Sequence, residues 1–324
     1  MAGQDRRGIV VLAGGFGGSK MSDGIAQAAG AGRPVSIVVN TGDDLELHGL
    51  TVCPDLDTVL YTLTGWANDA TGWGVRDETW SAKEMLGRYG APTWFGLGDR
   101  DLATHLVRTQ ALRAGERLTT VTGRLADALG APVAILPMCD EPVRTELRSD
   151  GEWLAFQEYF VHRHHAPPVA ALRRVGIEAA RPTPEVLAAL EGAALVVLAP
   201  SNPFVSIGTI LAVPGMEAAI RAAGVPVVAV SPIVGGGALR GPADRMLETI
   251  EGREATAAAV VAHYRARYPG LVTTYVIDER DAALLPAVRA GGPEPVLVLD
   301  TVMTDRPARA RLARAILDRL LPTA

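Results

Sequence analysis

The sequence is poor in cysteine and lacks any long uninterrupted hydrophobic run. Its 324 residues include two cysteines, Cys53 and Cys139, which are too few for a disulfide framework and show no metal-binding spacing. The first apolar run is too short for a signal peptide, and no later run reaches the roughly eighteen residues of a membrane span. These absences argue against a disulfide-stapled secreted protein and a membrane protein, so we expect a cytoplasmic protein without a membrane partner.

The chain also lacks a large excess of either acidic or basic residues. The 31 basic and 36 acidic residues leave a formal net charge of −5, which gives no reason to expect a nucleic-acid partner. A local basic pocket could still hold a phosphorylated small molecule. Because 48% of the residues are hydrophobic and 5% are aromatic, we expect a substantial core that is mostly aliphatic.

Signatures of covalent catalysis are missing as well. The chain has no serine nucleophile elbow, no HExxH or CxxC motif and no kinase signature. This leaves an enzyme that works by positioning phosphates and a metal ion, or a non-catalytic binder of nucleotide-type ligands.

Short β-branched and aliphatic runs recur along the chain, with helical segments between several of them. The runs lie at residues 9–13, 35–39, 133–136, 194–199, 226–230, 272–277 and 296–299, and helical segments at 18–31, 184–192, 215–223 and 242–263. Strands that alternate with helices form parallel sheets, and nearly continuous apolar strands suit a sheet covered on both faces. The sequence therefore predicts an α/β fold, a Rossmann-like parallel sheet with helices on both faces.

Other stretches depart from this alternation. Residues 55–130 hold few strand signals and many helix formers, which predicts a mostly helical insertion. Residues 143–162 contain the turn sequence "SDG" between two runs, which predicts a hairpin, and the final segment predicts an amphipathic closing helix. Because no linker separates these parts, we expect a single domain over residues 1–324.

The stretch "IVVLAGGFGGSK" places four glycines between a strand and a helix. Glycine lets a backbone approach a phosphate closely, and the N–H groups at a helix amino end point at an anion. The spacing matches neither a Walker A loop nor a clean GxGxxG fingerprint. We predict ligand contacts, with a purely structural turn as the alternative, for Gly14, Gly15, Gly17, Gly18, Ser19 and Lys20.

Residues 40–58, "NTGDDLELHGLTVCPDLDT", follow the second strand and concentrate acidic side chains. Open α/β sheets bind ligands at the carboxyl ends of their strands, where Asn40 and Thr41 would lie. Mg²⁺ with one or two carboxylates and diphosphate oxygens suits such a cluster. We predict that at least one of Asp43, Asp55 and Asp57 binds the metal and that Asp44 is a solvated neighbour. The alternative is that some of them cap a helix that starts near Asp55.

Tryptophan, arginine and acidic residues lie together in "WGVRDETWSAKE" and "WFGLGDRDLATHLVRTQ". Aromatic faces beside such groups suit a planar heterocycle with polar edges, and a helical hairpin with salt bridges is the alternative. The candidates in the second stretch are Asp99, Arg100 and His105, although a lone histidine is more often structural.

Two later strands also end in polar turns. "LAPSNPFVSIGTIL" offers Ser201, Asn202 and Ser206, although turn chemistry alone explains proline and asparagine there. "VSPIVGGGALRGPADRM" offers Arg240, whose guanidinium could pair with a phosphate or simply lie on a surface turn.

Together these stretches resemble the 2-phospho-L-lactate transferase family (CofD/FbiA), in its bacterial branch. The match runs in the family's order from about residue 9 to about residue 246. Its most specific parts are "GDRDLATHLVRT" and "APSNP" followed by "SIG", whereas the glycine loop alone is a weak signal. Bacterial relatives often carry "GGVGGARF" where this chain has "GGFGGSKM", so Phe16 and Lys20 put the donor preference in doubt more than the reaction class.

The resemblance implies a reaction in the biosynthesis of the deazaflavin coenzyme F-420. The donor would be a guanosine diphosphate-linked three-carbon acid, phospholactyl or phosphoenolpyruvyl, the acceptor the ribityl hydroxyl of the deazaflavin Fo, and the leaving group GMP. The resemblance also implies Mg²⁺, held by a carboxylate that matches Asp43 and by one in "PDLD", Asp55 or Asp57. In-line attack on a diphosphate needs charge neutralisation, and a carboxylate can take the hydroxyl proton, so these aspartates are the candidate catalytic residues. We also expect a homodimer.

Two rival functions remain open. The predicted sheet and the glycine loop also resemble those of the YvcK-like regulators, which bind a UDP-sugar and have no transferase activity. The stretches "RDETW" and "GDRDLATHLVRTQ" favour the transferases instead. An NAD-dependent oxidoreductase is disfavoured because the fingerprint is imperfect and no ribose-binding acid follows the second strand.

Overall fold

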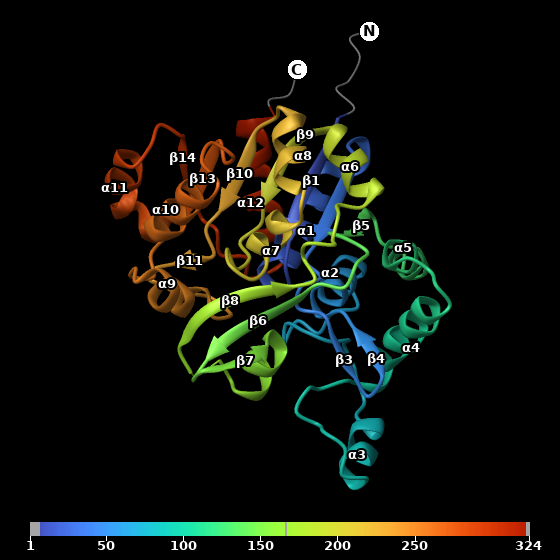
Figure 1. The fold of residues 1–324 in the computed structure, drawn as a ribbon. Coiled ribbons are helices and arrows are strands. Elements are labelled where there is room, and N and C mark those ends of the chain that lie inside the picture. Colours follow the sequence, from blue (N-terminus) through green and yellow to red (C-terminus); the bar gives the residue numbers. More distant parts are fainter. Residues whose placement is uncertain (1–6, 166, 322–324) are drawn as a thin grey trace.

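Seven parallel strands form the central sheet of the computed structural model, which describes residues 7–165 and 167–321 (Figure 1). Their order is β14-β13-β10-β9-β1-β2-β5, and each adjacent pair is parallel. All seven predicted runs are confirmed as strands, with the bounds β1 Gly8–Ala13, β2 Val35–Val39, β5 Ala134–Pro137, β9 Ala193–Leu198, β10 Val227–Val230, β13 Thr274–Asp278 and β14 Val296–Leu299.

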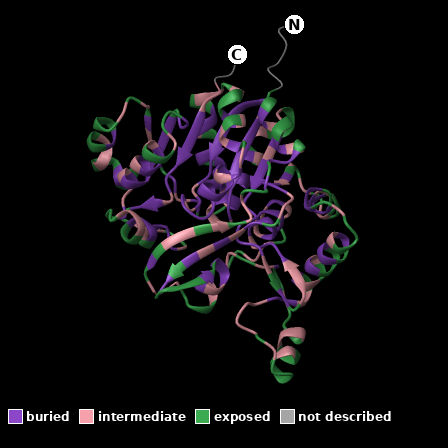
Figure 2. Ribbon diagram, viewed as in Figure 1, coloured by how far each residue is buried: buried purple, intermediate pink, exposed green. Residues whose placement is uncertain are grey.

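Helices cover both faces of this sheet, as predicted. Along β1 the side chains of Val10 and Leu12 join one hydrophobic cluster and those of Ile9 and Val11 join the other. The first cluster lies under α6 Pro184–Glu191, α7 Ile207–Ala212, α8 Met216–Ala223 and α10 Ala257–Arg267. The second lies under α1 Phe16–Ala29, α2 Pro54–Thr64, α5 Leu118–Ala128 and α12 Arg306–Leu320. Burial is therefore continuous along the inner strands β9, β10 and β13, whereas the edge strands β5 and β14 are partly exposed (Figure 2).

The stretch expected to be a helical insertion contains α2, α3 Ser81–Arg88, α4 Asp99–Arg113 and α5. Helices α2 and α5 pack on the sheet, whereas α3 projects away from it (Figure 1). A small hairpin, β3 Leu45–Leu47 with β4 Leu50–Val52, precedes these helices and was not predicted. Its strands of three residues are too short to show an alternating pattern.

The predicted hairpin around "SDG" is confirmed, but it ends earlier than expected. β6 Arg144–Ser149 pairs with β7 Glu152–Ala155 across Asp150 and Gly151, which both adopt left-handed φ values of 50° and 85°. Residues 158–162 form a π-helix (η2) instead of strand, and an unpredicted third strand, β8 Val169–Val175, pairs with β6.

Two helix predictions need correction. Residues 242–263 do not form one helix, because left-handed Gly252 (φ 63°) ends α9 Ala243–Glu251 before α10 begins. α1 begins at Phe16, so Gly17 and Gly18 lie in its first turn and not in the preceding loop. The remaining elements are η1 Gly30–Gly32, β11 Ile233–Val234, β12 Gly237–Ala238, η3 Glu279–Leu284 and α11 Leu285–Ala290.

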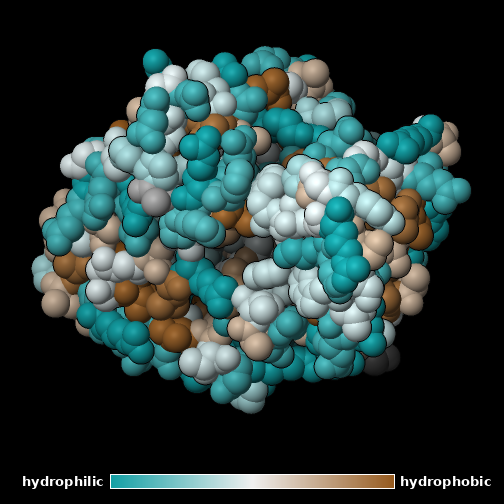
Figure 3. All heavy atoms as spheres, turned by 90° about the horizontal axis from the view of Figure 1, so that it is seen from below, coloured by the Kyte–Doolittle hydropathy of each residue, from teal (hydrophilic) through white to brown (hydrophobic). Residues whose placement is uncertain are grey.

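The carboxyl ends of the parallel strands all lie at one edge of the sheet, where the glycine loop and the predicted acidic stretch follow β1 and β2. Seen from this side, the molecular surface is hollowed near its middle (Figure 3). Within residues 7–165 and 167–321, no helix combines the length and hydrophobicity needed to cross a membrane.

Close packing of α1 on α12 depends on a glycine. A Cβ atom on Gly24 would lie 2.4 Å from the carbonyl oxygen of Arg309, which is backbone and cannot swing away. We predict that Gly24→Ala lowers the unfolding free energy by about 1–3 kcal/mol in urea denaturation. Gly32→Ala is the control, because its Cβ would meet nothing within 4 Å and its φ is not left-handed. Equal stability of the two variants would contradict this packing.

Candidate active site

The glycine loop packs directly against the start of α2 and the turn after β9. The Gly14 amide donates to Ser201 Oγ at 3.0 Å, and a Cβ on Gly14 would lie 2.4 Å from Ser206 Oγ. A Cβ on Gly15 would lie 2.7 Å from Asp55 Oδ1. These glycines are therefore needed for close packing inside the protein itself, as the structural alternative proposed, and this packing brings two serines and Asp55 to the amino end of α1.

The next two glycines are crowded in the same way. A Cβ on Gly17 would lie 2.2 Å from the carbonyl oxygen of Pro200, and one on Gly18 would lie 2.7 Å from Ser201 Oγ. Ser19 Oγ donates to the carbonyl of Phe16 within the first turn of α1. The first turn of α1 therefore fits against the turn after β9, with no room for a side chain at either glycine.

Asn40 holds the acidic stretch together at the end of β2. Its Nδ2 donates to Asp55 Oδ2 at 2.9 Å, and its Oδ1 accepts from the Gly42 amide at 2.9 Å. Burial raises the pKa of Asp55 to about 6, although hydrogen bonds from Asn40 and the Gly15 amide oppose the rise. The pKa of Asp43 lies well above its usual range because of burial first and the charge of Asp55 second. Asp43 and Asp55 thus lie close enough to repel one another.

This pair fits a magnesium ion. Asp43 is 4% exposed, and its Oδ1 has no hydrogen-bond partner, which leaves a buried carboxylate oxygen that lacks a cation or donor. Mg²⁺ is commonly held by one or two carboxylates, with water and substrate oxygens as the other ligands. Among the described residues no group of three or more His, Cys, Asp or Glu side chains is arranged to hold a metal. Asp43 and Asp55 would therefore provide a two-carboxylate site that water and substrate complete.

Asp44 is not the solvated neighbour that we predicted. It is 7% exposed, its Oδ1 has no hydrogen-bond partner, and burial raises its pKa to about 7. The charges of Arg144 and Arg108 and a hydrogen bond with Cys53 lower that pKa in part. The prediction failed because residues far away in the sequence pack on this loop: the Thr145 amide donates to the carbonyl of Gly42 and Gln157 Nε2 donates to the carbonyl of Asp43. Sequence patterns do not show such contacts.

Asp57 belongs to a different buried network. Both of its oxygens accept from Arg108, which is 1% exposed, and His105 Nδ1 lies 3.7 Å from Asp57 Oδ2. On its other side, His105 Nε2 lies 3.2 Å from Asp101 Oδ2, outside hydrogen-bond geometry, and Tyr61 donates to Asp101 Oδ1 at 2.7 Å. The pairing of Asp57 with Arg108 argues against a metal-ligand role for Asp57. The position of His105 between Asp57 and Asp101 favours a structural role for this histidine.

Arg108 was not among the predicted residues, although a signal for it exists. Asp101, His105 and Arg108 recur at spacings of four and three in "DLATHLVR", which places them on one face of α4. Charged residues on a helix face usually point to solvent, so the spacing alone does not reveal that this face is buried.

Asp99 and Arg100 stabilise the insertion instead of joining the acidic pair. The Asp99 carboxylate accepts from Thr79 Oγ1 and from the amides of Ser81 and Ala82, and so caps the amino end of α3. These hydrogen bonds lower the pKa of Asp99. Arg100 Nη1 donates to the carbonyl of Arg76. These contacts favour the alternative of a locally bonded helical segment over a heterocycle site at these two residues.

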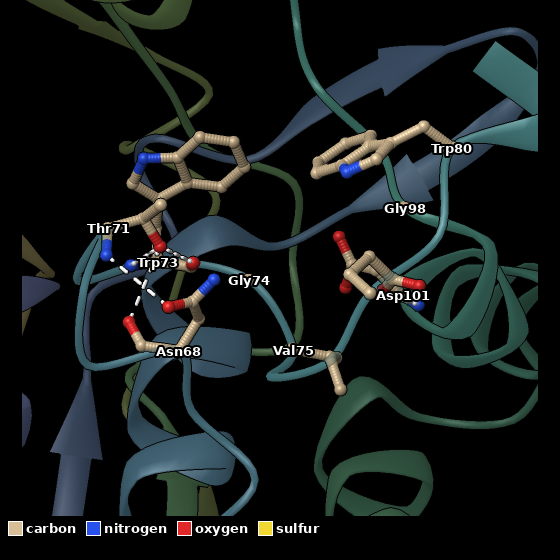
Figure 4. Close-up of a pocket in the computed structure, with 9 residues that line it drawn as sticks. Asn68, Thr71, Trp73, Gly74, Val75, Trp80, Gly98 and Asp101 are labelled. Carbon is tan, nitrogen blue, oxygen red and sulfur yellow. Dashed lines mark hydrogen bonds between the residues drawn. The ribbon is translucent and has the colours of Figure 1, made fainter. Parts of the chain in front are cut away.

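The tryptophans of the insertion form a narrow cavity. Trp73 and Trp80 have ring centroids 6.3 Å apart at an interplanar angle of 69°, and Asn68, Val75 and Asp101 line the space beside them (Figure 4). The cavity holds about 20 Å³, which is room for one water molecule. A planar tricyclic ring could enter only if the tryptophans moved apart.

The other predicted residues make local contacts. Asn202 Oδ1 accepts from the amides of Phe204 and Val205, as turn chemistry predicts, and Thr41 Oγ1 lies 3.6 Å from Cys139 Sγ. Lys20 and Arg240 both lie over the Phe16 ring, and neither contacts the Asp43–Asp55 pair.

The amino-acid sequence of this chain matches a known protein family. The family model described as "2-phospho-L-lactate transferase CofD" matches residues 9–304. The chain is 49% identical over 316 residues to a phosphoenolpyruvate transferase of Streptomyces coelicolor, and 44% identical over 333 aligned positions to one of Mycobacterium avium. Both matches cover 95% of this chain and 97% of the relative.

A solved structure shares the fold. It is a member of the UPF0052 family from Bacillus halodurans, with a TM-score of 0.61 over 97% of this chain and 100% of the other. At 15% identity this likeness concerns the fold alone.

Loss of charge should destabilise the protein to different degrees at the two aspartates of α2, Asp55 and Asp57. Asp57→Asn leaves Arg108 buried without a full counter-charge, and we predict a loss of about 3–5 kcal/mol in unfolding free energy. Asp55→Asn removes repulsion with Asp43 but leaves one acceptor oxygen for the two donors, Asn40 and the Gly15 amide, so we predict a smaller loss than in Asp57→Asn. Urea denaturation with a chelator present measures both, and equal losses would contradict the separation of the two sites.

Burial of Asp44 should give stability a distinct pH dependence. Between about pH 4 and 7 the folded protein retains a proton that the unfolded chain has lost, so this group lowers stability as pH rises through that range. We predict that Asp44→Asn reduces the fall in unfolding free energy between pH 5 and pH 8 by about 2–3 kcal/mol. Exposed Asp318→Asn is the control, and a wild-type pH profile in Asp44→Asn would refute the effect.

Proposed function

The chain belongs to the CofD family of 2-phospho-L-lactate transferases, and on this basis we propose that it transfers a phosphorylated three-carbon acid in coenzyme F-420 biosynthesis. The donor is guanosine diphosphate-linked, the acceptor is the ribityl hydroxyl of the deazaflavin Fo, and GMP leaves. The match over residues 9–304 is the observation that carries the proposal. The paired carboxylates at the sheet edge supply chemistry suited to it.

The acid of the donor is proposed to be phosphoenolpyruvyl. Relatives in Streptomyces and Mycobacterium that are 43–49% identical over 95% or more of this chain carry the name phosphoenolpyruvate transferase. The phospholactyl donor is the alternative within the same reaction class.

The reaction needs one bond to form and one to break. The ribityl oxygen attacks the phosphorus that carries the three-carbon acid, the diphosphate bond breaks, and the phosphate of GMP takes the electron pair. Asp43 and Asp55 would hold Mg²⁺, which when bound would neutralise charge on the diphosphate. A carboxylate of the buried cluster accepts the hydroxyl proton, since burial brings these groups toward neutral pKa values. The amide groups at the start of α1 face the same edge and favour negative charge.

The alternative function, UDP-sugar binding by a YvcK-like regulator, is supported mainly by the fold. A sheet of this kind serves unrelated functions, so the likeness to the UPF0052 structure does not favour UDP-sugar binding in this chain. The homodimer and the cytoplasmic location stay predictions.

We predict that the purified protein with Mg²⁺, Fo and the enolpyruvyl donor yields GMP and a phosphodiester. Mass spectrometry of the products identifies the transferred acid, and the lactyl donor in a parallel reaction tests the alternative. Absence of GMP with either donor, together with tight UDP-sugar binding, would overturn the transferase proposal.

Asp43→Asn should abolish turnover while the fold remains intact. The substitution removes one of the two carboxylates proposed to hold Mg²⁺ and relieves a buried charge, so circular dichroism and thermal unfolding should stay close to wild type. Asp318→Asn on the exposed side of α12 is the matched control. Unchanged turnover in Asp43→Asn would refute the metal role of this residue.

A further inference from the structure

A second polar cavity lies on the outer face of α1, and we call it the outer α1 pocket. Phe16, Ser19 and Lys20, spaced three and four residues apart, line it from α1. Residues 67–69, Gly72 and the start of α12, including Arg306 and Arg309, form most of the other walls. Its volume is about 250 Å³, enough for a phosphorylated three-carbon compound, and neither carboxylate of the Asp43–Asp55 pair lines it.

Two cations lie over the Phe16 ring: Lys20, which lines the pocket, and Arg240, which reaches the ring from the loop after β12. Lys20 Nζ lies 4.3 Å from the ring centroid and the Arg240 guanidinium carbon lies 4.5 Å from it. Lys20 donates to the carbonyl of Met303, and Arg240 donates to the carbonyl of Thr71. Within the described residues neither of these two cations has a carboxylate within ion-pair distance. A ring contact offsets only part of what a full counter-charge supplies.

The carboxylates nearby are already engaged. Asp23 is shared by Arg306 and Arg309, at 3.3 and 3.1 Å, and Asp305 accepts from the Ala308 amide as the cap of α12. Asp69 reaches Arg309 at 3.3 Å, but its side chain is 85% exposed, which weakens the pair.

Positive charge is therefore in excess around the pocket. Four cations, two at the ring and two from α12, face three carboxylates. Arg309 is 8% exposed and its Nε has no hydrogen-bond partner. The pKa of Lys20 lies below its usual value, first because of burial and then because of the charges of Arg309 and Arg240.

We propose that the outer α1 pocket binds a small anion carrying a phosphate or carboxylate group, with Lys20 and Arg240 as its principal partners. The site is separate from the Asp43–Asp55 pair, because α1 turns Phe16 and Lys20 outward while Gly14 and Gly15 face Asp55. The anion can be part of the transferase donor or a free phosphorylated acid. The first case rests on the proposed function and the second does not.

Titration of inorganic phosphate into the metal-free protein by calorimetry tests the site without any turnover. We expect Lys20→Met and Arg240→Met each to weaken phosphate binding about tenfold or more, because each removes a charge-assisted contact. Lys83→Met is the matched control: Lys83 also lies over a ring, 5.3 Å from the Trp80 centroid, but on α3. Neither test variant should lose stability, since each removes a cation from a crowded positive cluster.

Wild-type phosphate affinity in both Lys20→Met and Arg240→Met would overturn the proposal. So would phosphate affinity that changes in Asp43→Asn but stays at the wild-type level in Lys20→Met, because the anion would then lie at the sheet edge. Repeating the titration with saturating guanosine diphosphate separates the two sources. Competition supports a site that holds part of the donor, and undiminished phosphate binding supports an independent anion site.

Discussion

The burial of two neighbouring carboxylates, Asp43 and Asp55, is the constraint around which the sheet edge is organised. Like charges in a shared buried space repel each other, so they need donors or a cation. Asn40 and the Gly15 amide supply donors to Asp55, and the glycine loop must lack side chains for its backbone to come this close. Asp43 receives less compensation, because its Oδ1 has no hydrogen-bond partner, and this oxygen is the one that we propose for a metal ion. The absence of side chains at these glycines is therefore required for the packing of Asp55, whether or not a phosphate binds here.

A second buried charge explains how α4 is held against α2, which itself packs on the sheet. Arg108 on α4 pairs with Asp57 on α2, and the pair is closed to solvent. Asp55 and Asp57 are two residues apart, so they point about 200° apart around the helix axis. One therefore faces the glycine loop and the other faces α4. The two aspartates of "PDLD" look equivalent in the sequence but differ in role: Asp55 places charge at the sheet edge, and Asp57 holds α4 against α2.

Much of the architecture could be predicted because it depends on local patterns. Seven apolar runs became seven parallel strands, and "SDG" marked a real hairpin turn. The short pairs β3–β4 and β11–β12 and the strand β8 were missed, since strands that are short or half exposed lack a clear period. The break between α9 and α10 depends on left-handed Gly252, and it was missed because the spacing of apolar residues continues on both sides of this glycine. The site was predicted as a set of strand-end residues, but not as two separate networks with Asp44 buried beside them.

The sequence by itself determined the alternation of strands and helices, the polar residues that follow the strands and the family to which they belong. These features depend on neighbours along the chain, where spacing and residue type are directly visible. Only the tertiary structure decided which polar residues share a space. The Gly14–Ser201 contact spans 187 positions and the Asp57–Arg108 pair spans 51. Burial and pairing are set by such distant contacts, and they determine whether a carboxylate is capped, paired with an arginine or left open for a cation.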